Sequence, residues 1–521
     1  MSSEQPNVLV LISDEHSFRC LGHSSDDHAE PVQTPALDGL AAAGVSFPEA
    51  YCQMPLCTPS RLCLLTGRRS DRCNAFGNNR ILPPTCPTIA ESLTNAGYRT
   101  ALVGKMHLGG SRQFVGFEDR PYGDLTGGTG HQWEPLERSG GRKMRDRTRD
   151  AGVTEVPESA HQERVTIEES VAWIREREAS GDTPWFLTAS LSRPHFPLTA
   201  PRRHLGRYWD LETDEPTDRL SRPAVGHTGD TTDHPMTIGA IEGFQTHEID
   251  LHEQQRARAA YFACVDYLDE LIGDFLATLD RDGALDNTIV VYTTDHGELA
   301  GEHGLWWKHT WHEAAAKVPL IIQTPEHRSG MREPSIIDTP VGLIDLFPTI
   351  CALTDVSAPR SIDGVSLAGA VLEGENADRG PVVCDNLTDR WGAGTAFRMV
   401  REGSYKYVAF EAAPELFFDL SSDPLEQINL AVRPAAMSEE ASTAFNRLRQ
   451  FVEESISFES VATRRAEGKG LATEYALETE TVSSSGNCYQ LPSGDVIDAD
   501  RSLYDPYVVT DDPRRTFPDR P

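Results

Sequence analysis

The chain has 521 residues, of which 39% are hydrophobic and 25% charged. This composition is typical of a globular protein with a sizeable core and excludes a disordered or fibrous one. The length allows about two to four domains at roughly 150 residues each. The formal net charge of −32 produces a surface that repels nucleic acids and anionic lipids, so we expect neither as a partner.

The N-terminal segment predicts no targeting signal. MSSEQPNVLVLIS has no basic start, and its apolar run from Val8 to Ile12 is too short for a signal peptide or a membrane span. No later stretch approaches ~20 uninterrupted apolar residues. The ten cysteines show no disulfide spacing. We therefore expect a cytoplasmic protein with reduced thiols and no membrane partner.

Short apolar runs alternate with longer stretches of helical periodicity along most of the chain. The apolar runs predict buried strands at 7–13, 99–103, 185–191, 288–294 and 318–323. A spacing of 3.6 residues predicts helices over 88–96, 162–178 and 253–279. This alternation predicts an α/β fold, with a large, mostly parallel mixed sheet sandwiched by helices.

The pattern changes after about residue 395. Residues 397–400 and 405–410 flank a predicted hairpin turn, 415–420 predict a third strand, and 437–454 predict an amphipathic helix. These elements predict a smaller C-terminal antiparallel α+β subdomain.

The stretch that begins near Ser457 is polar, acidic and without a clear period. It predicts either a disordered tail or an arm ordered by a partner subunit, and in the second case a homo-oligomer. We therefore divide the chain into a catalytic domain (1–395), a C-terminal subdomain (396–456) and a tail or oligomerisation arm (457–521).

One short segment combines a cysteine, a predicted helix start and an arginine. It reads Cys57-Thr58-Pro59-Ser60-Arg61, and Leu62-Cys63-Leu64-Leu65-Thr66-Gly67 follows. Thr58 is a good N-cap, and Pro59 fits the first helical position. The free N–H groups of such a helix favour an anion near Cys57, and Arg61 adds a charged fork. By themselves these residues fit either an activated cysteine or a buried thiol beside an ordinary capped helix.

Acidic residues follow two of the predicted strands. Asp14 and Glu15 end the first, and Asp295-His296-Gly297 ends the strand at 288–294. The carboxyl ends of parallel strands commonly gather ligands, and oxygen and imidazole donors suit a divalent cation. A strand-end acid that stands alone is more often a simple loop cap.

Three more motifs follow predicted strands. They are Gly104-Lys105-Met106-His107, Arg193-Pro194-His195-Phe196-Pro197, and Trp307-Lys308-His309-Thr310. Taken singly, each Lys or His is more typical of a surface.

Together these motifs resemble the formylglycine-dependent sulfatases of the alkaline phosphatase superfamily, over roughly residues 7–430. Cys-x-Pro-Ser-Arg followed by Leu-x-Thr-Gly is similar to that family's signature. The resemblance implies that a formylglycine-generating enzyme reads Pro59 and Arg61 and oxidises Cys57 to an aldehyde, which hydrates to a diol. It implies catalytic roles for Cys57, Arg61, Lys105, His107, His195 and Lys308, and metal ligation by Asp14, Glu15, Cys57, Asp295 and His296.

The same resemblance implies one divalent cation and a sulfate-ester substrate. Ca²⁺ is the first expectation, with Mg²⁺ or Mn²⁺ as alternatives, and His296 favours Mn²⁺ more than an asparagine would. Arg61, Lys105 and Lys308 would offset charge on the sulfuryl oxygens, His195 or Lys308 would protonate the leaving group, and His107 would act as a base. Glu15 stands where the family often has Asp or Gln, which leaves its role open.

Residues 104–109, 113–118 and 302–308 resemble choline sulfatases in particular, so choline sulfate is a candidate substrate. Trp306, Trp307 and Trp391 are then candidates for an aromatic surface that binds a quaternary ammonium group, although buried core tryptophans are more common. A phosphonate monoester or phosphodiester hydrolase with the same residues is an alternative. A non-catalytic binding protein is a weaker one, because the set of site residues is nearly complete.

Overall fold

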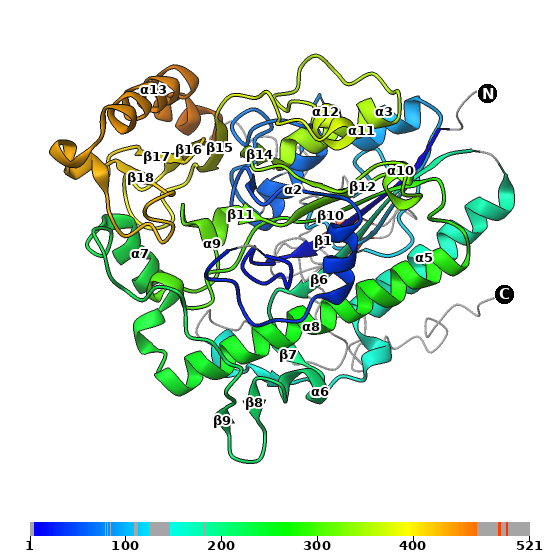
Figure 1. The fold of residues 1–521 in the computed structure, drawn as a ribbon, viewed down its shortest axis with the longest axis horizontal. Helices are drawn as coiled ribbons and strands as arrows, with labels where there is room; N and C mark the ends of the chain where they lie inside the picture. Colours follow the sequence, from blue (N-terminus) through cyan, green and yellow to red (C-terminus); the bar gives the residue numbers. More distant parts are fainter. Residues whose placement is uncertain are drawn as a thin grey trace.

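A seven-stranded mixed sheet forms the centre of the molecule (Figure 1). The computed structural model describes residues 5–465, except 25, 79, 81, 84, 109–112, 124–145 and 182, and in the tail only 488–490 and 496–498. The strands lie in the order β13 (Ser335–Ile336), β2 (Val45–Ser46), β12 (Leu320–Gln323), β10 (Thr288–Thr294), β1 (Asn7–Asp14), β6 (Trp185–Pro194) and β4 (Arg99–Gly104).

Four adjacent strands of this sheet, β10, β1, β6 and β4, are parallel to one another. β12 runs antiparallel to both β10 and β2. The predicted mostly parallel mixed sheet is therefore confirmed.

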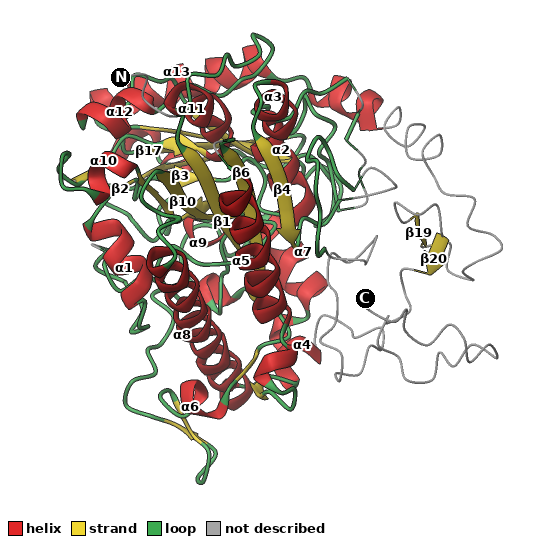
Figure 2. Ribbon diagram, turned by 90° about the vertical axis from the view of Figure 1, so that its right-hand side faces the viewer, coloured by secondary structure: helices red, strands yellow, loops and turns green. Residues whose placement is uncertain are grey.

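Helices cover both faces of the sheet, which is why its strands read as continuous apolar runs. Leu9 and Leu11 of β1 pack on the face covered by α1 (Pro35–Ala42), α5 (Gln162–Ser180) and α8 (Leu251–Arg281). Val8, Val10 and Ile12 pack on the face covered by α2 (Cys57–Thr66), α3 (Ile89–Asn95) and α11 (Leu346–Leu353). Figure 2 shows α5 and α8 on one side of the sheet and α3 and α11 on the other.

The predicted strand at 318–323 is wrong as a single element. Pro319 divides it into β11 (Lys317–Val318) and β12, which belong to different sheets. β11 pairs with β3 (Ala50–Tyr51) in a three-stranded sheet that also contains β14 (Val341–Gly342). Proline has no N–H to continue a strand ladder, so the chain changes sheets at this residue.

The C-terminal subdomain is a four-stranded antiparallel sheet covered by one helix. The strands are β15 (Val382–Asn386), β16 (Phe397–Glu402), β17 (Tyr405–Phe410) and β18 (Leu416–Asp419), and the helix is α13 (Glu439–Ser455). The last three strands and the helix were predicted. β15 was not, and it lies within the range 1–395, so the sheet begins before the boundary that the sequence suggests.

A buried ion cluster joins this subdomain to the segment after Lys308. The Nζ of Lys406 lies 2.8 Å from Oε1 of Glu313 and 2.6 Å from Oε1 of Glu426. Glu313 begins α9 (Glu313–Ala316), and its backbone N–H donates to Glu426. The C-terminal sheet therefore helps to fix the chain that leads from Lys308 back to the central sheet.

Among the described helices, none is both long enough and apolar enough to cross a lipid bilayer. The nine cysteines whose side chains are described are free and buried. Most of the predicted tail, at 466–487, 491–495 and 499–521, lies outside the described residues.

Candidate active site

The carboxyl ends of the four parallel strands meet at one edge of the sheet. Each strand ends at or just before a buried residue that was predicted for the site: Asp295 after β10, Asp14 at the end of β1, His195 after β6 and Lys105 after β4. Parallel pairing places these four ends side by side, as expected for ligands of an α/β sheet.

Unusual backbone conformations surround this edge. Gly104 has φ +91°, and a Cβ at this position would lie 2.1 Å from the carbonyl oxygen of Ser190. Glu15 and His107 adopt left-handed conformations with φ +69° and +55°. For non-glycine residues such conformations cost free energy, and they persist where the surrounding structure imposes them, commonly at functional sites.

Cys57 occupies the first turn of α2, and both the prediction of Thr58 as N-cap and that of Pro59 as the first helical residue are wrong. The helix begins at Cys57 with Leu56 as N-cap and no side-chain cap. The hydroxyl of Thr58 instead donates to the carbonyl oxygen of His107, at 2.6 Å. This long-range hydrogen bond draws the loop after β4 toward the start of α2.

Arg61 lies at the centre of the site and has no exposed side-chain surface. Its Nη2 donates to Oδ2 of Asp14 at 2.7 Å, and its Nε donates to Oδ2 of Asp295 at 2.8 Å. Its Nη1 donates to the Lys105 carbonyl at 2.7 Å and to the Ser190 hydroxyl at 2.8 Å. One guanidinium therefore orients both carboxylates and joins three strand ends to α2.

The remaining carboxylate oxygens face a compact group of possible cation ligands. One ligand atom from each of Asp14, Cys57, Asp295 and His296 lies within 4.8 Å of the other three, and all four residues are buried. The Sγ of Cys57 is 3.3 Å from Nε2 of His296 and 3.8 Å from Oδ1 of Asp14. Such oxygen and imidazole donors fit a divalent cation, and Arg61 fixes the two carboxylates from behind.

Positive neighbours keep the Asp14 carboxylate ionised. Burial alone would raise its pKa, but Lys105, His195, Arg61 and His296 together lower the pKa of Asp14 well below its usual value. The Nζ of Lys105 lies 2.9 Å from Oδ2 of Asp14. Asp14 is therefore available as an anionic ligand over the whole physiological pH range.

Glu15 belongs to a second group on the other side of Asp14. Its Oε2 lies 2.8 Å from the Nζ of Lys308 and 3.4 Å from Nε2 of His195. Burial and the negative charge of Glu15 raise the pKa of the neighbouring Glu298 well above its usual value. In the structure the Glu15 carboxylate is thus the ion-pair partner of Lys308, and cation ligation by it stays a prediction.

His195 and His107 lie on either side of these groups. Nδ1 of His195 is 2.8 Å from the carbonyl oxygen of Phe196, and its Nε2 lies 3.7 Å from Oδ1 of Asp14. If Nδ1 carries a proton that it donates to this carbonyl, Nε2 faces the carboxylates. His107 is buried and is linked to α2 through Thr58. The predicted site residues therefore gather in one region, although their catalytic roles stay predictions.

Sequence reasoning missed Ser190, Glu298 and Arg147. Ser190 and Glu298 are ordinary in sequence, and only their packing against Arg61 and Glu15 reveals them. Arg147 lies in α4 (Asp146–Arg149) and interacts electrostatically with Glu15 and Cys57. The sequence could have indicated Arg147, because residues 142–149 contain five basic residues, an unusual cluster in a chain of net charge −32.

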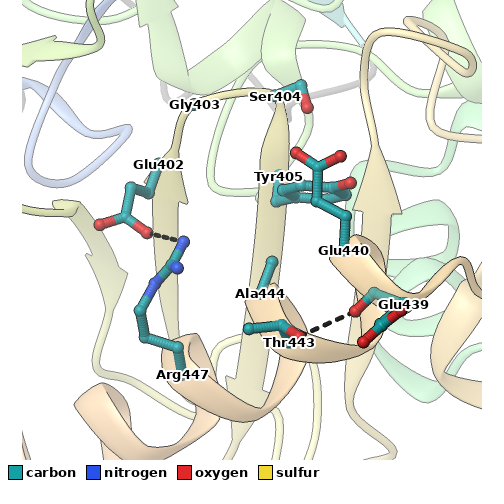
Figure 3. A pocket seen from close by; sticks show the side chains of 9 residues that line it. All are labelled: Glu402, Gly403, Ser404, Tyr405, Glu439, Glu440, Thr443, Ala444 and Arg447. Atoms are coloured by element: carbon teal, nitrogen blue, oxygen red, sulfur yellow. Dashed lines mark hydrogen bonds and ion pairs between the residues drawn. The ribbon is translucent and has the colours of Figure 1, made fainter.

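A separate pocket of about 620 Å³ lies in the C-terminal subdomain, between the β16–β17 hairpin and α13 (Figure 3). Glu402, Glu439 and Glu440 line it together with Arg447, which pairs with Glu402. Its lining includes none of the predicted site residues, and its acidic character disfavours an anionic substrate.

Comparison with known proteins identifies the family. The "Sulfatase" family profile matches residues 6–356, and a second profile, "N-sulphoglucosamine sulphohydrolase, C-terminal", matches residues 301–453. A choline-sulfatase of Rhizobium meliloti (strain 1021) is 32% identical over 470 residues, which cover 86% of this chain and 87% of the relative. The chain belongs to the sulfatase family.

Other relatives agree with this assignment. An arylsulfatase of Clostridium perfringens is 27% identical over 82% of this sulfatase and 90% of its own length. The solved phosphonate monoester hydrolase of Agrobacterium radiobacter has the same fold, with a TM-score of 0.69, 20% identity, and coverage of 95% of this chain and 99% of that one. The protein is a sulfuric ester hydrolase, and it has the α/β fold with a mostly parallel mixed sheet that the sequence predicted.

Proposed function

We propose that this sulfatase cleaves the S–O bond of a sulfate ester with a formylglycine nucleophile derived from Cys57 and one divalent cation. The observation that carries the proposal is the position of Cys57. Its Sγ lies against His296 and Asp14 at the edge where Arg61, Lys105 and Lys308 also converge. An anionic ester therefore meets local positive charge in an otherwise strongly acidic chain.

The cation would be held by Asp14, Asp295, His296 and residue 57, with Ca²⁺, Mg²⁺ and Mn²⁺ as candidates. It would supply Lewis-acid stabilisation of the sulfuryl oxygens. The protein's own contribution is to orient the two carboxylates through Arg61 and to exclude water from the buried ligand group.

The other side chains supply charge and proton transfer. Lys105 and Lys308 would offset the charge of the sulfuryl group, and either His195 or Lys308 would protonate the departing alcohol oxygen. His107 would take a proton from the sulfated diol, so that sulfate leaves and the aldehyde is restored. Each of these roles rests on the resemblance to the family and on the proximity of the groups.

Mass spectrometry of tryptic peptides, from protein purified out of its own host, tests the nucleophile. The peptide that ends at Arg61 should be lighter by roughly 18 Da than its sequence predicts, the change for conversion of a thiol to an aldehyde. The next peptide, 62–68, contains Cys63 and should keep its sequence mass, which makes it an internal control. An unmodified Cys57 in active enzyme would contradict the proposal.

Cation binding should stabilise the protein measurably. After chelation, addition of Ca²⁺, Mg²⁺ or Mn²⁺ at ~100 times its Kd should increase the free energy of unfolding by about 2.7 kcal/mol. Thermal unfolding with and without each ion measures this effect. Asp295→Asn should abolish most of the increase, whereas Asp363→Asn, a substitution at an ion pair with Arg72 away from the site, should not. An equal response in both variants would place the cation elsewhere.

The phosphonate monoester or phosphodiester alternative uses the same group of residues. The ratio of kcat/KM for an aryl sulfate to that for a phosphonate monoester with the same leaving group separates the two activities. A ratio above one supports the sulfatase proposal, and a ratio far below one supports the alternative.

A further inference from the structure

Three tryptophans, Trp306, Trp307 and Trp391, were predicted to bind a quaternary ammonium group, but their rings are already covered by other parts of the protein. The guanidinium carbon of Arg147 lies 5.4 Å from the ring centroid of Trp307, and that of Arg390 lies 4.9 Å from the ring centroid of Trp391. Trp306 is only 2% exposed. The protein's own cations therefore already contact the rings that a choline head would need.

Trp391 also has a structural role that explains its burial. Its indole N–H donates to the carbonyl oxygen of His309 at 3.0 Å, and its ring packs against Phe244 at a centroid distance of 4.5 Å. This hydrogen bond fixes the backbone next to Lys308. The ring is thus a support of the site rather than an exposed ligand surface.

The ring of Phe196 lies between Arg147 and the site residue Lys308. Its guanidinium carbon is 3.5 Å from the centroid of Phe196, and the Nζ of Lys308 is 5.6 Å from the same centroid. Phe196 follows His195 directly, and the two rings are 3.8 Å apart. The guanidinium also interacts electrostatically with Cys57 and Glu15, so it lies beside the place where an ester would be cleaved.

Among the described residues, this arginine differs from the other cations of the site because no carboxylate contacts its guanidinium. Arg61 contacts Asp14 and Asp295, Lys105 contacts Asp14, and Lys308 contacts Glu15. In contrast, within the described part of the chain, the contacts of Arg147 are with aromatic rings only, and its side chain is partly buried.

The electrostatic surroundings agree with this geometry. Burial, and to a smaller extent the positive charge of Arg390, lowers the pKa of Arg147 to about 10, although Glu15 and Cys57 act in the opposite direction. A guanidinium in such surroundings is stabilised when an oxyanion binds, because the oxyanion supplies a negative charge and hydrogen-bond acceptors.

We propose that Arg147 binds a second oxyanion on the alcohol portion of the sulfate ester. This inference rests on the proposed function, because it names the substrate class of the same site. The substrate is then a sulfate ester that also carries a carboxylate or a further sulfate. A substrate with a cationic head, such as choline sulfate, would approach the Arg147 guanidinium and be disfavoured.

A matched pair of aryl sulfates tests the proposal: 4-carboxyphenyl sulfate and its neutral methyl ester. The quantity to measure is the selectivity, defined as kcat/KM for the acid divided by kcat/KM for the ester. Arg147→Gln should lower this selectivity about ten-fold or more, the effect of losing one charge-assisted hydrogen bond. Because the two leaving groups are compared within each variant, their intrinsic reactivities cancel between variants.

Arg149→Gln is the matched control. It removes the same charge from the same short helix, but Arg149 is exposed. Its selectivity should equal that of the unmodified sequence. An equal loss in both variants would mean a general field effect, and would overturn the specific role of Arg147. The proposal would also be overturned if choline sulfate were a better substrate than 4-carboxyphenyl sulfate and if Arg147→Gln did not increase kcat/KM for choline sulfate.

A binding measurement keeps this test independent of the nucleophile. In a Cys57→Ala background, calorimetry should give a Kd for 4-carboxyphenyl sulfate that rises about ten-fold with Arg147→Gln, while the Kd of the methyl ester changes much less. This result would support the second-oxyanion site even if no aldehyde forms at residue 57. Equal changes for both ligands would overturn the inference and leave the proposed sulfatase chemistry intact.

Discussion

Replacement of Cys57 by alanine should abolish sulfate-ester hydrolysis, with kcat reduced on the order of 10⁴-fold or more, as when other enzymes lose a covalent nucleophile. Alanine cannot be converted to an aldehyde, and it also removes one of the four clustered ligand positions. Initial rates on an aryl sulfate, with cation in excess, measure the effect.

The matched control for this substitution is Cys63→Ala in the same helix. Cys63 is buried, and its Sγ lies 3.8 Å from that of Cys73, so its loss removes packing but no site group. That variant should keep most of its activity. If Cys57→Ala retained a comparable rate, a water molecule or another side chain would have to be the nucleophile.

Replacement of Arg61 by methionine should have the largest effect on stability. The substitution leaves the carboxylates of Asp14 and Asp295 without their buried partner, and removing one member of a buried ion pair costs about 3–5 kcal/mol. Lys105 still contacts Asp14, so Asp295 should account for most of the loss. Chemical denaturation in the presence of a chelator measures the change in unfolding free energy.

Two choices keep this experiment interpretable. The Cys57→Ala background removes any effect of Arg61 on modification of the cysteine. Arg69→Met is the control, because the ion pairs of Arg69 with described residues are long, at 3.8 Å and 4.0 Å, and its side chain is partly exposed. Such a pair contributes about 0–1 kcal/mol. A similar loss in both variants would show that Arg61 does not organise the site. Excess cation should reduce the loss at Arg61, since it neutralises the same carboxylates.

The central strands were predictable because their signal is local. A run such as Thr288-Ile289-Val290-Val291 is apolar and β-branched, and burial on both faces of a parallel sheet requires such a run. Asp14, Lys105, His195 and Asp295 could then be placed at one edge, because parallel strands end on the same side. The Cys57 motif added the family resemblance, and with it the expected chemistry.

Interactions between distant segments could not be predicted in the same way. Thr58 has the sequence features of an N-cap, yet its hydroxyl donates to the His107 carbonyl, 49 residues away. Pro319 ends a strand that the apolar pattern would continue, because the ladder requires an N–H that proline lacks. Both outcomes depend on which backbone groups tertiary packing brings within reach.

The sequence by itself determined the central fold, the family and the group of residues around Cys57, because apolar periodicity and motif spacing are properties of contiguous segments. The tertiary structure alone decided which charges are paired. Lys308 contacts Glu15, Arg61 contacts two carboxylates, and within the part of the chain that the structure describes Arg147 contacts only aromatic rings. A charge's partner depends on distances between segments far apart in the chain, which no local pattern encodes, and in this sulfatase the partner decides which cation is available to the substrate.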